Sequence, residues 1–181
     1  MENMQDSIEK VLFDEQTIKN IVQGLGKQIS KDYEGKKLLL VSVLKGSVVF
    51  MADLMRSIDI HCEIDFMVVS SYGSGTKTSG NVRIIKDLNI DINGYDVLIV
   101  EDILDSGVTL STLKSMLQAR GPASIKICTF IDKPERRVAD IRADYTGTTV
   151  PDEFIVGYGL DFDEKFRNLP YVGVLKRECY E

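Results

Sequence analysis

Residues 97–112 read VLIVEDILDSGVTLST and join an apolar run, a group of acids and the start of a helix. The apolar run is typical of a strand that is buried on both faces of a sheet. The acids Glu101, Asp102 and Asp105 follow it, and Gly107 stands where the chain turns. We then expect a helix from residue 108 to residue 120, which Gly121 and Pro122 end. A buried strand that runs through a polar turn into a helix is typical of a parallel α/β sheet.

The rest of the chain alternates in the same way, so we expect an α/β fold built on one sheet. Asp14 is a suitable N-cap for the first helix. We find no internal repeat and no linker, and we expect residues 1–181 to form a single domain. The expected helices are residues 15–33, 46–58 and 108–120, and the expected strands are residues 37–44, 60–71, 82–88, 96–101, 124–132, 154–157 and 171–175.

The composition limits the classes of function. The chain has 181 residues, of which 44% are hydrophobic and 28% charged, and its net charge is -6. Without a basic cluster we expect no nucleic acid partner. We also expect no membrane partner, because no apolar run approaches the roughly 18–20 residues of a bilayer span. The odd set of Cys62, Cys128 and Cys179 indicates reduced thiols, and no signal peptide is evident, so we expect a cytoplasmic protein.

The turn after the acids has the chemistry of a sugar-phosphate site. Backbone amides at a helix N-terminus attract a phosphate, and Gly107 lets the backbone approach it closely. Ser106 and Thr109 can add hydroxyl donors. The neighbouring acids Glu101 and Asp102 would instead meet hydroxyl groups or a cation. The alternative is a cluster of acids that only caps the following helix.

This segment resembles the phosphoribosyl pyrophosphate signature of the type I phosphoribosyltransferases. The resemblance implies a central, mainly parallel twisted sheet flanked by helices, with a small hood formed by the N- and C-terminal segments. The acids, their spacing along the chain and the strand–loop–helix context all match the signature. The matching residues are Glu101, Asp102, Asp105, Ser106, Gly107 and Thr109.

The same resemblance assigns roles to these residues. Glu101 and Asp102 would hold the ribose 2'- and 3'-hydroxyls, partly through Mg²⁺, and residues 105–109 would cradle the 5'-phosphate. Asp105 would exchange a proton with N7 of the purine. Val108 stands where some relatives carry lysine, so backbone amides would replace one side-chain contact.

Other segments resemble the hypoxanthine-guanine branch of that family. The resemblance extends from about residue 38 to residue 176. Lys45 and Gly46 match its pyrophosphate loop, although Ser47 stands where some relatives have glycine, and Arg167 matches its pyrophosphate arginine. In the family the peptide bond before the residue that matches Lys45 can be cis. The alternative for Lys45 is a solvated lysine at the end of a strand.

Ser71 and Tyr72 resemble the start of the catalytic lid of this branch. Residues 72–80, YGSGTKTSG, have no apolar anchor and the composition of a mobile loop. A lid would keep water from an oxocarbenium-like intermediate. The alternative is a loop with no function. A dinucleotide-binding fingerprint is excluded, because the glycine spacing is wrong and a strand follows.

The same resemblance implies a purine site at Lys133, Phe154 and Ile155. Lys133 would donate to the 6-oxo group and so reject adenine, which presents a donor there. Phe154 would stack on the purine, although its spacing alone also fits a core residue. Asp161 would join Glu101 and Asp102 as a magnesium ligand.

The remaining charged residues near these motifs are expected to be solvated. They are Arg136, Arg137, Asp163 and Glu164.

The resemblance thus implies a magnesium-dependent transferase of purine salvage. It would move the phosphoribosyl group of phosphoribosyl pyrophosphate to N9 of hypoxanthine or guanine, and would act as a homodimer or homotetramer. Acceptance of xanthine stays open. A different class of protein, a phosphoribosyl pyrophosphate-sensing regulator on the same fold, would need a nucleic-acid surface that this sequence does not suggest.

Overall fold

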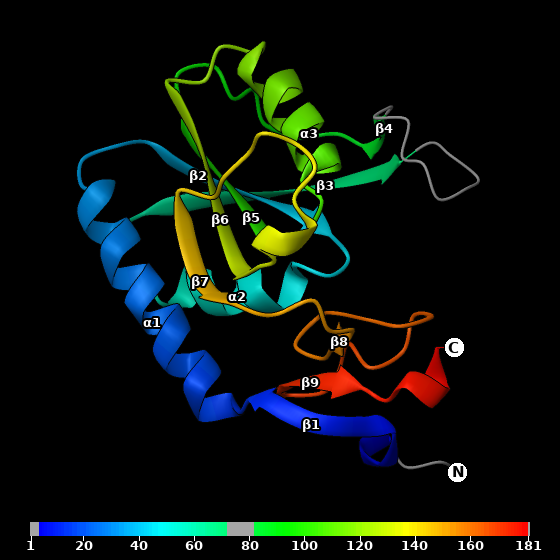
Figure 1. Cartoon of the computed structure of the whole chain (residues 1–181). Coiled ribbons are helices and arrows are strands. Elements are labelled where there is room, and N and C mark those ends of the chain that lie inside the picture. Colours follow the sequence, from blue (N-terminus) through cyan, green and yellow to red (C-terminus); the bar gives the residue numbers. More distant parts are fainter. Residues whose placement is uncertain (1–3, 72–81, 181) are drawn as a thin grey trace.

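The computed structural model describes residues 4–71 and 82–180. Within them the chain alternates between strands and helices, and its strands form two sheets (Figure 1). The elements in chain order are η1 Met4–Ser7, β1 Ile8–Phe13, α1 Glu15–Asp32, β2 Leu38–Leu44, α2 Val48–Arg56, β3 Cys62–Ser71, β4 Val82–Lys86, β5 Asp96–Leu104, α3 Val108–Gln118, β6 Ser124–Asp132, η2 Pro134–Arg136, β7 Tyr145–Thr149, β8 Ile155–Val156, β9 Val172–Leu175 and η3 Arg177–Cys179.

The larger sheet has the strand order β4-β3-β2-β5-β6-β7, and every neighbouring pair is parallel except β3 with β4. The expected α/β fold with a mainly parallel sheet is therefore confirmed. From β2 the chain adds β3 on one side and later returns to add β5 on the other. In such sheets ligands bind beyond the carboxyl ends of the strands at the point where the order reverses. That point lies between β2 and β5.

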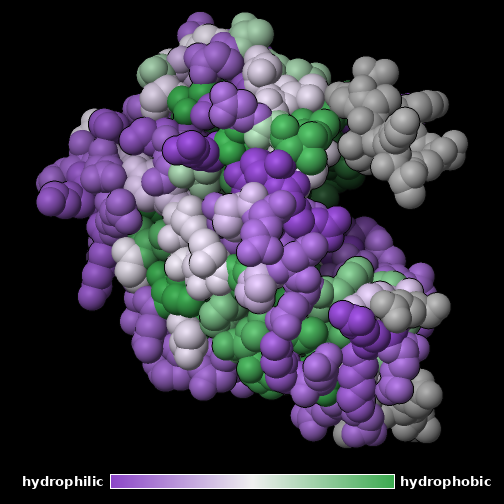
Figure 2. Space-filling view, viewed as in Figure 1, coloured by the Kyte–Doolittle hydropathy of each residue, from purple (hydrophilic) through white to green (hydrophobic). Residues whose placement is uncertain are grey.

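Each face of the sheet has its own core, as expected for strands buried on both sides. Alternate residues of β2 face opposite ways: Leu38 and Leu40 pack in the core beneath α1 and α2, and Leu39 and Val41 pack in the core beneath α3. Figure 1 shows α3 on the opposite side of the sheet from α1 and α2. The outer side of α1 is hydrophilic (Figure 2).

The first helix begins where the sequence predicted. The Asp14 carboxylate accepts a hydrogen bond of 2.8 Å from the Thr17 amide, which satisfies one of the free amides at the start of α1. The buried side chains of α1 follow helical spacing. They are Ile18, Val22, Leu25 and Ile29.

A second, three-stranded sheet joins the two ends of the chain in the order β1-β9-β8. Figure 1 shows it beside the larger sheet, with both termini on this side of the molecule. This is the hood expected from N- and C-terminal segments. The sequence prediction missed β1, because Glu9 and Lys10 interrupt its apolar pattern, and it missed β7, which contains a glycine and three threonines.

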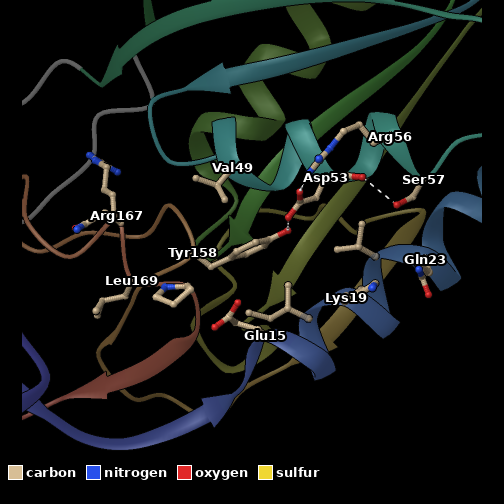
Figure 3. A pocket seen from close by; sticks show the side chains of 14 residues that line it. Glu15, Lys19, Gln23, Val49, Asp53, Arg56, Ser57, Tyr158, Arg167 and Leu169 are labelled. Atoms are coloured by element: carbon tan, nitrogen blue, oxygen red, sulfur yellow. Dashed lines mark hydrogen bonds and ion pairs between the residues drawn. The ribbon is translucent and has the colours of Figure 1, made fainter.

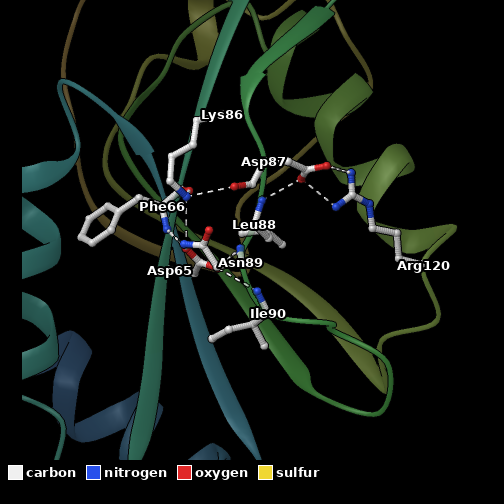
Figure 4. A network of polar contacts seen from close by, with 8 residues as sticks. All are labelled: Asp65, Phe66, Lys86, Asp87, Leu88, Asn89, Ile90 and Arg120. Carbon is white, nitrogen blue, oxygen red and sulfur yellow. Dashed lines mark hydrogen bonds and ion pairs between the residues drawn. The ribbon is translucent and has the colours of Figure 1, made fainter.

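A buried acid that the sequence did not reveal fixes the connection after β4. The Asp65 carboxylate, only 5% exposed, accepts hydrogen bonds from the amides of Phe66, Asn89 and Ile90 (Figure 4). Burial opposes ionisation of this carboxyl, but the three amides and the charge of Lys86 together outweigh burial and lower its pKa. Asp65 thus ties residues 87–90 to β3.

All three cysteines are free thiols, and Cys128 is buried in β6. None of the helices in residues 4–71 and 82–180 combines the length and apolar character needed to cross a bilayer.

Candidate active site

The acids of β5 lie where the sheet opens. Strand β5 is longer than predicted and pairs with β6 as far as Leu104, whereas its pairing with β2 ends at Val100. Glu101 and Asp102 therefore belong to the strand itself, past its last contact with β2. This places them at the switch point of the sheet, beside the loop that leaves β2.

The turn between β5 and α3 has the geometry of an anion site. Gly107 has a φ of 77°, a left-handed conformation that favours glycine, and no side chain caps the first turn of α3. The amides at this end of the helix are therefore open to an anion. A Cβ at Gly107 would lie 2.5 Å from Cγ2 of Ile141, so the turn is packed tightly from behind. Val108 is the first residue of the helix.

The loop after β2 touches the acids directly. The peptide bond between Leu44 and Lys45 is cis, as it can be in the family that the sequence resembles. A Cβ on Gly46 would lie 1.8 Å from Oδ2 of Asp102, so the close approach needs glycine. A Cβ on Gly159 would lie 2.1 Å from the Gly46 carbonyl oxygen. The two glycines thus bring the β2 loop, β5 and residues 157–167 together.

Arg167 is held at this junction by several oxygens. It donates to the Gly159 carbonyl at 2.8 Å, and its guanidinium lies 2.9 Å from Asp161 and 3.4 Å from Glu164. Glu164 also lies 3.1 Å from Nζ of Lys45. Glu164 is 64% exposed, as expected of a solvated acid, but it also faces both cations of the predicted pyrophosphate site. The Lys45 hydrogen bond lowers the pKa of Glu164.

The segment that carries Arg167 has an unusual backbone. Residues with positive φ outside glycine are rare, and they concentrate at functional sites. Here they are Tyr158, Asp163, Glu164 and Phe166.

The two acids of β5 are poorly solvated. Burial, and then the charge of Asp102, raise the pKa of Glu101 well above its usual value. Burial also raises the pKa of Asp102 to about 6, although the Ile103 amide and Arg167 act in the opposite direction. Carboxylates in this situation are stabilised by hydroxyl donors or by a cation.

The oxygen donors near Asp102 could hold Mg²⁺ only if water and substrate supplied further ligands. No cluster of three potential metal ligands occurs within the described part of the chain. Asp102 and Asp161 are nevertheless close enough for Asp161 to raise the pKa of Asp102. Mg²⁺ is usually bound by one or two carboxylates together with water and substrate phosphates, and this pair of acids fits that pattern.

Asp105 stands at the start of the turn and is 41% exposed. Its Oδ1 lies 3.2 Å from Nε of Arg136, which makes an ion pair, and Arg136 also lies 3.5 Å from Asp152. Arg136 is exposed, as expected, but it contacts the predicted catalytic acid.

Among the predicted purine residues, Lys133 follows the end of β6, Phe154 precedes β8 of the small sheet, and Ile155 is the first residue of β8. Lys133 is 5% exposed, and its Nζ donates to the Glu153 carbonyl at 2.5 Å. Phe154 is 37% exposed, and its ring stacks on Tyr180 at a centroid distance of 4.8 Å. The Ile155 side chain is buried in the core. A contact of Ile155 with a base would therefore involve its backbone.

Comparisons with known proteins agree with this geometry. A model of the phosphoribosyl transferase domain matches residues 10–163. A hypoxanthine-guanine phosphoribosyltransferase of Streptococcus thermophilus is 56% identical over 98% of each chain. The chain belongs to the hypoxanthine-guanine phosphoribosyltransferase family. A crystal structure of a hypoxanthine phosphoribosyltransferase from Staphylococcus aureus has a TM-score of 0.97 at 53% identity, over 98% of this chain and 97% of the other. A Trypanosoma cruzi enzyme of the same name, solved with its substrates as a ternary complex, has a TM-score of 0.93 at 40% identity, over 97% of this chain and 100% of the other.

One residue of this phosphoribosyltransferase differs sharply from the sequence expectation. Arg137 was expected to be solvated, but its side chain is only 15% exposed. The guanidinium donates to the carbonyls of Leu104, Asp105 and Ile141. The expectation failed because a run of charges in a turn does not reveal which side chain finds carbonyl partners.

The lid prediction for this family member falls largely outside the described residues. Ser71 is the last residue of β3, and its side chain is not described. Tyr72 lies outside the described residues.

A cavity of about 540 Å³ lies between α1 and α2, apart from the turn between β5 and α3 (Figure 3). Tyr158 projects into it and donates to Asp53 at 2.8 Å. Of the predicted site residues that the structure describes, Arg167 alone lines this cavity.

Proposed function

We propose that the protein transfers the 5-phosphoribosyl group of phosphoribosyl pyrophosphate to N9 of hypoxanthine or guanine. The products would be IMP or GMP and pyrophosphate, which is a reaction of purine salvage. The observation that carries the proposal is the meeting of three elements at one end of the sheet. The uncapped start of α3, the acid Asp102 and the loop at Gly46 all lie at the carboxyl ends of β2 and β5.

Each element suits one part of the sugar substrate. The amides of residues 105–109, with the hydroxyls of Ser106 and Thr109, would bind the 5'-phosphate. Glu101 and Asp102 would accept hydrogen bonds from the ribose hydroxyls, which relieves the poor solvation of their carboxylates.

Lys45, Gly46 and Arg167 would bind the pyrophosphate. As the C1–O bond of the ribose breaks, its electron pair leaves with pyrophosphate, so negative charge grows beside these groups. Lys45 and Arg167 already lie together around Glu164, and the Gly46 amide adds a neutral donor. Charges that are placed in advance stabilise such a transition state without reorganisation.

The base would lie between Phe154 and the turn. Its ring would stack on Phe154, its 6-oxo group would accept from Lys133, and N9 would form the new bond to C1. The N7 proton would pass to Asp105, which acts as general base, and would return from it in the reverse reaction. Adenine would place an amino donor against the ammonium group of Lys133, which is also a donor, so the hydrogen bond that the 6-oxo group accepts would be lost.

We propose that Glu101, Asp102 and Asp161 hold Mg²⁺ together with the substrate. When bound, the metal ion would neutralise charge on the pyrophosphate oxygens. The pairing of Asp161 with Arg167 keeps this acid oriented toward the site.

Three further features belong to the proposal. Ser71 and Tyr72 would begin a lid over the substrates. The protein would work in the cytoplasm as a homodimer or homotetramer, and light scattering after gel filtration measures that state.

The proposal is tested by one spectrophotometric assay of hypoxanthine, guanine, xanthine and adenine, each with phosphoribosyl pyrophosphate and Mg²⁺. We expect turnover of hypoxanthine and guanine and none of adenine. Turnover of xanthine would extend the substrate class to all 6-oxopurines. Absence of turnover with every base, together with nucleic acid binding that responds to phosphoribosyl pyrophosphate, would favour the regulator and contradict the proposal.

A further inference from the structure

Arg137 lies directly behind the phosphate turn. Its Nε donates to the Asp105 carbonyl at 2.8 Å, and its Nη2 donates to the Leu104 carbonyl at 3.0 Å. Its other contacts are the Ile141 carbonyl at 2.7 Å and the carboxylate of Asp132. A planar guanidinium can serve acceptors on several sides at once, which one ammonium group cannot do.

These bonds determine which way the turn presents its amides. In a trans peptide the carbonyl and the amide of the same plane point in opposite directions. The Asp105 carbonyl shares its plane with the Ser106 amide, and the Leu104 carbonyl shares its plane with the Asp105 amide. Arg137 draws both carbonyls backward, so both amides are turned toward the opposite side.

Neighbouring backbone completes the same pattern. The Ser106 carbonyl accepts from the amides of Val138 at 2.9 Å and Ala139 at 3.1 Å, which orients the Gly107 amide in the same way. A Cβ on Gly107 would lie 3.0 Å from Cδ of Arg137, so the side-chain stem also packs against the turn.

We propose that Arg137 is a positioning residue, which fixes the phosphate turn through the carbonyls of Leu104 and Asp105 without touching the substrate. This inference rests on the proposed function, because it assigns the turn to the 5'-phosphate. The competing interpretation is a general structural role, in which Arg137 only ties the end of β6 to its surroundings.

The test compares two ligands that use different parts of the site. Ribose 5-phosphate would use the turn, and inorganic pyrophosphate would use Lys45 and Arg167, which are held by other partners. Calorimetric titration measures both affinities in the presence of Mg²⁺. The variant is Arg137→Lys, and the matched control is Arg142→Lys, at an exposed arginine of the same segment.

For Arg137→Lys we expect affinity for ribose 5-phosphate to fall about tenfold or more. This is the scale expected when charge-assisted hydrogen bonds that orient the turn are lost. Affinity for pyrophosphate should stay within about twofold, and the KM for phosphoribosyl pyrophosphate should rise more than the KM for hypoxanthine. Arg142→Lys should match the wild type in all of these. Equal losses for both ligands, or no loss for either, would overturn the inference.

A second variant keeps the test valid if Arg137→Lys does not fold. Asp132→Asn removes only the charged partner of Arg137 and keeps its carbonyl bonds. This variant should lower the affinity for ribose 5-phosphate by about two- to fivefold and leave the affinity for pyrophosphate unchanged. An unselective change in this variant would also contradict a positioning role. If wild-type protein binds neither ligand, the proposed function itself is refuted, and the inference falls with it.

Discussion

Replacement of Asp102 by asparagine should stabilise the ligand-free protein while it weakens the function. The Asp102 carboxylate lies against the backbone of Gly46, and burial raises its pKa to about 6 from 3.8. Asparagine has nearly the same shape but carries no charge. The change therefore removes a cost that the site imposes on the folded chain.

The size of this effect follows from linkage. The folded state holds the proton of Asp102 more tightly than the unfolded state, so the contribution of Asp102 to the free energy of unfolding falls as pH rises from about 4 to about 6 and is then constant. The difference between the two pKa values corresponds to about 3 kcal/mol. Because Asp102 is only half-buried, screening by solvent reduces this value, and we expect about 1–2 kcal/mol. In a chain of this size that raises the melting temperature by about 3–6 °C.

Thermal melts of both proteins without ligand, between pH 4 and pH 8, measure the effect. Asp102→Asn should melt higher than the wild type above pH 6, and the difference should shrink toward pH 4. With Mg²⁺ and phosphoribosyl pyrophosphate the order should reverse, because only the wild type gains the carboxylate contacts. Asp163→Asn, at an exposed acid, is the control. A wild type that is equally or more stable at pH 7.5 without ligand would refute the reasoning.

Three other substitutions test separate parts of the site. Asp105→Asn should lower kcat by about 100-fold or more with little change in KM, as measured by steady-state kinetics, and unchanged kcat would remove Asp105 from acid–base catalysis. Lys133→Ala should reduce the preference for hypoxanthine over adenine in kcat/KM by about tenfold or more, and wild-type values for both bases would show that another group selects the base. Glu164→Gln removes a charge that competes with pyrophosphate for two cations, so the KM for phosphoribosyl pyrophosphate should fall by about two- to fivefold. Asp163→Asn is its control on the same loop, and equal effects of the two variants would contradict a specific role for Glu164.

The sequence predicted the parts of the fold whose signal is local. The apolar runs of β2, β5 and β6 and the N-cap at Asp14 can be recognised without a structure, because burial on both faces and helix capping leave direct patterns. Strand β1 could not be recognised. It is held by pairing with β9, which is distant in sequence and close only in the folded chain.

The same distinction applies to the site. Motif spacing predicted a phosphate site in the turn at residues 105–109, but it could not reveal which residues lie behind or opposite that turn. Arg137 finds its carbonyl partners, and Gly46 meets Asp102, only when the sheet brings distant segments together. The positive φ of Glu164 and its contacts with two cations likewise depend on the folded loop.

The central claim is that the turn between β5 and α3 binds the sugar phosphate while the adjacent acids bind the sugar hydroxyls. A crystal structure of this protein with IMP and Mg²⁺ tests it most directly. We predict the 5'-phosphate within hydrogen-bond distance of the amides of residues 106–109, and the ribose hydroxyls beside Glu101 and Asp102. A nucleotide bound elsewhere, for example in the cavity between α1 and α2, with the turn free of ligand, would contradict the account.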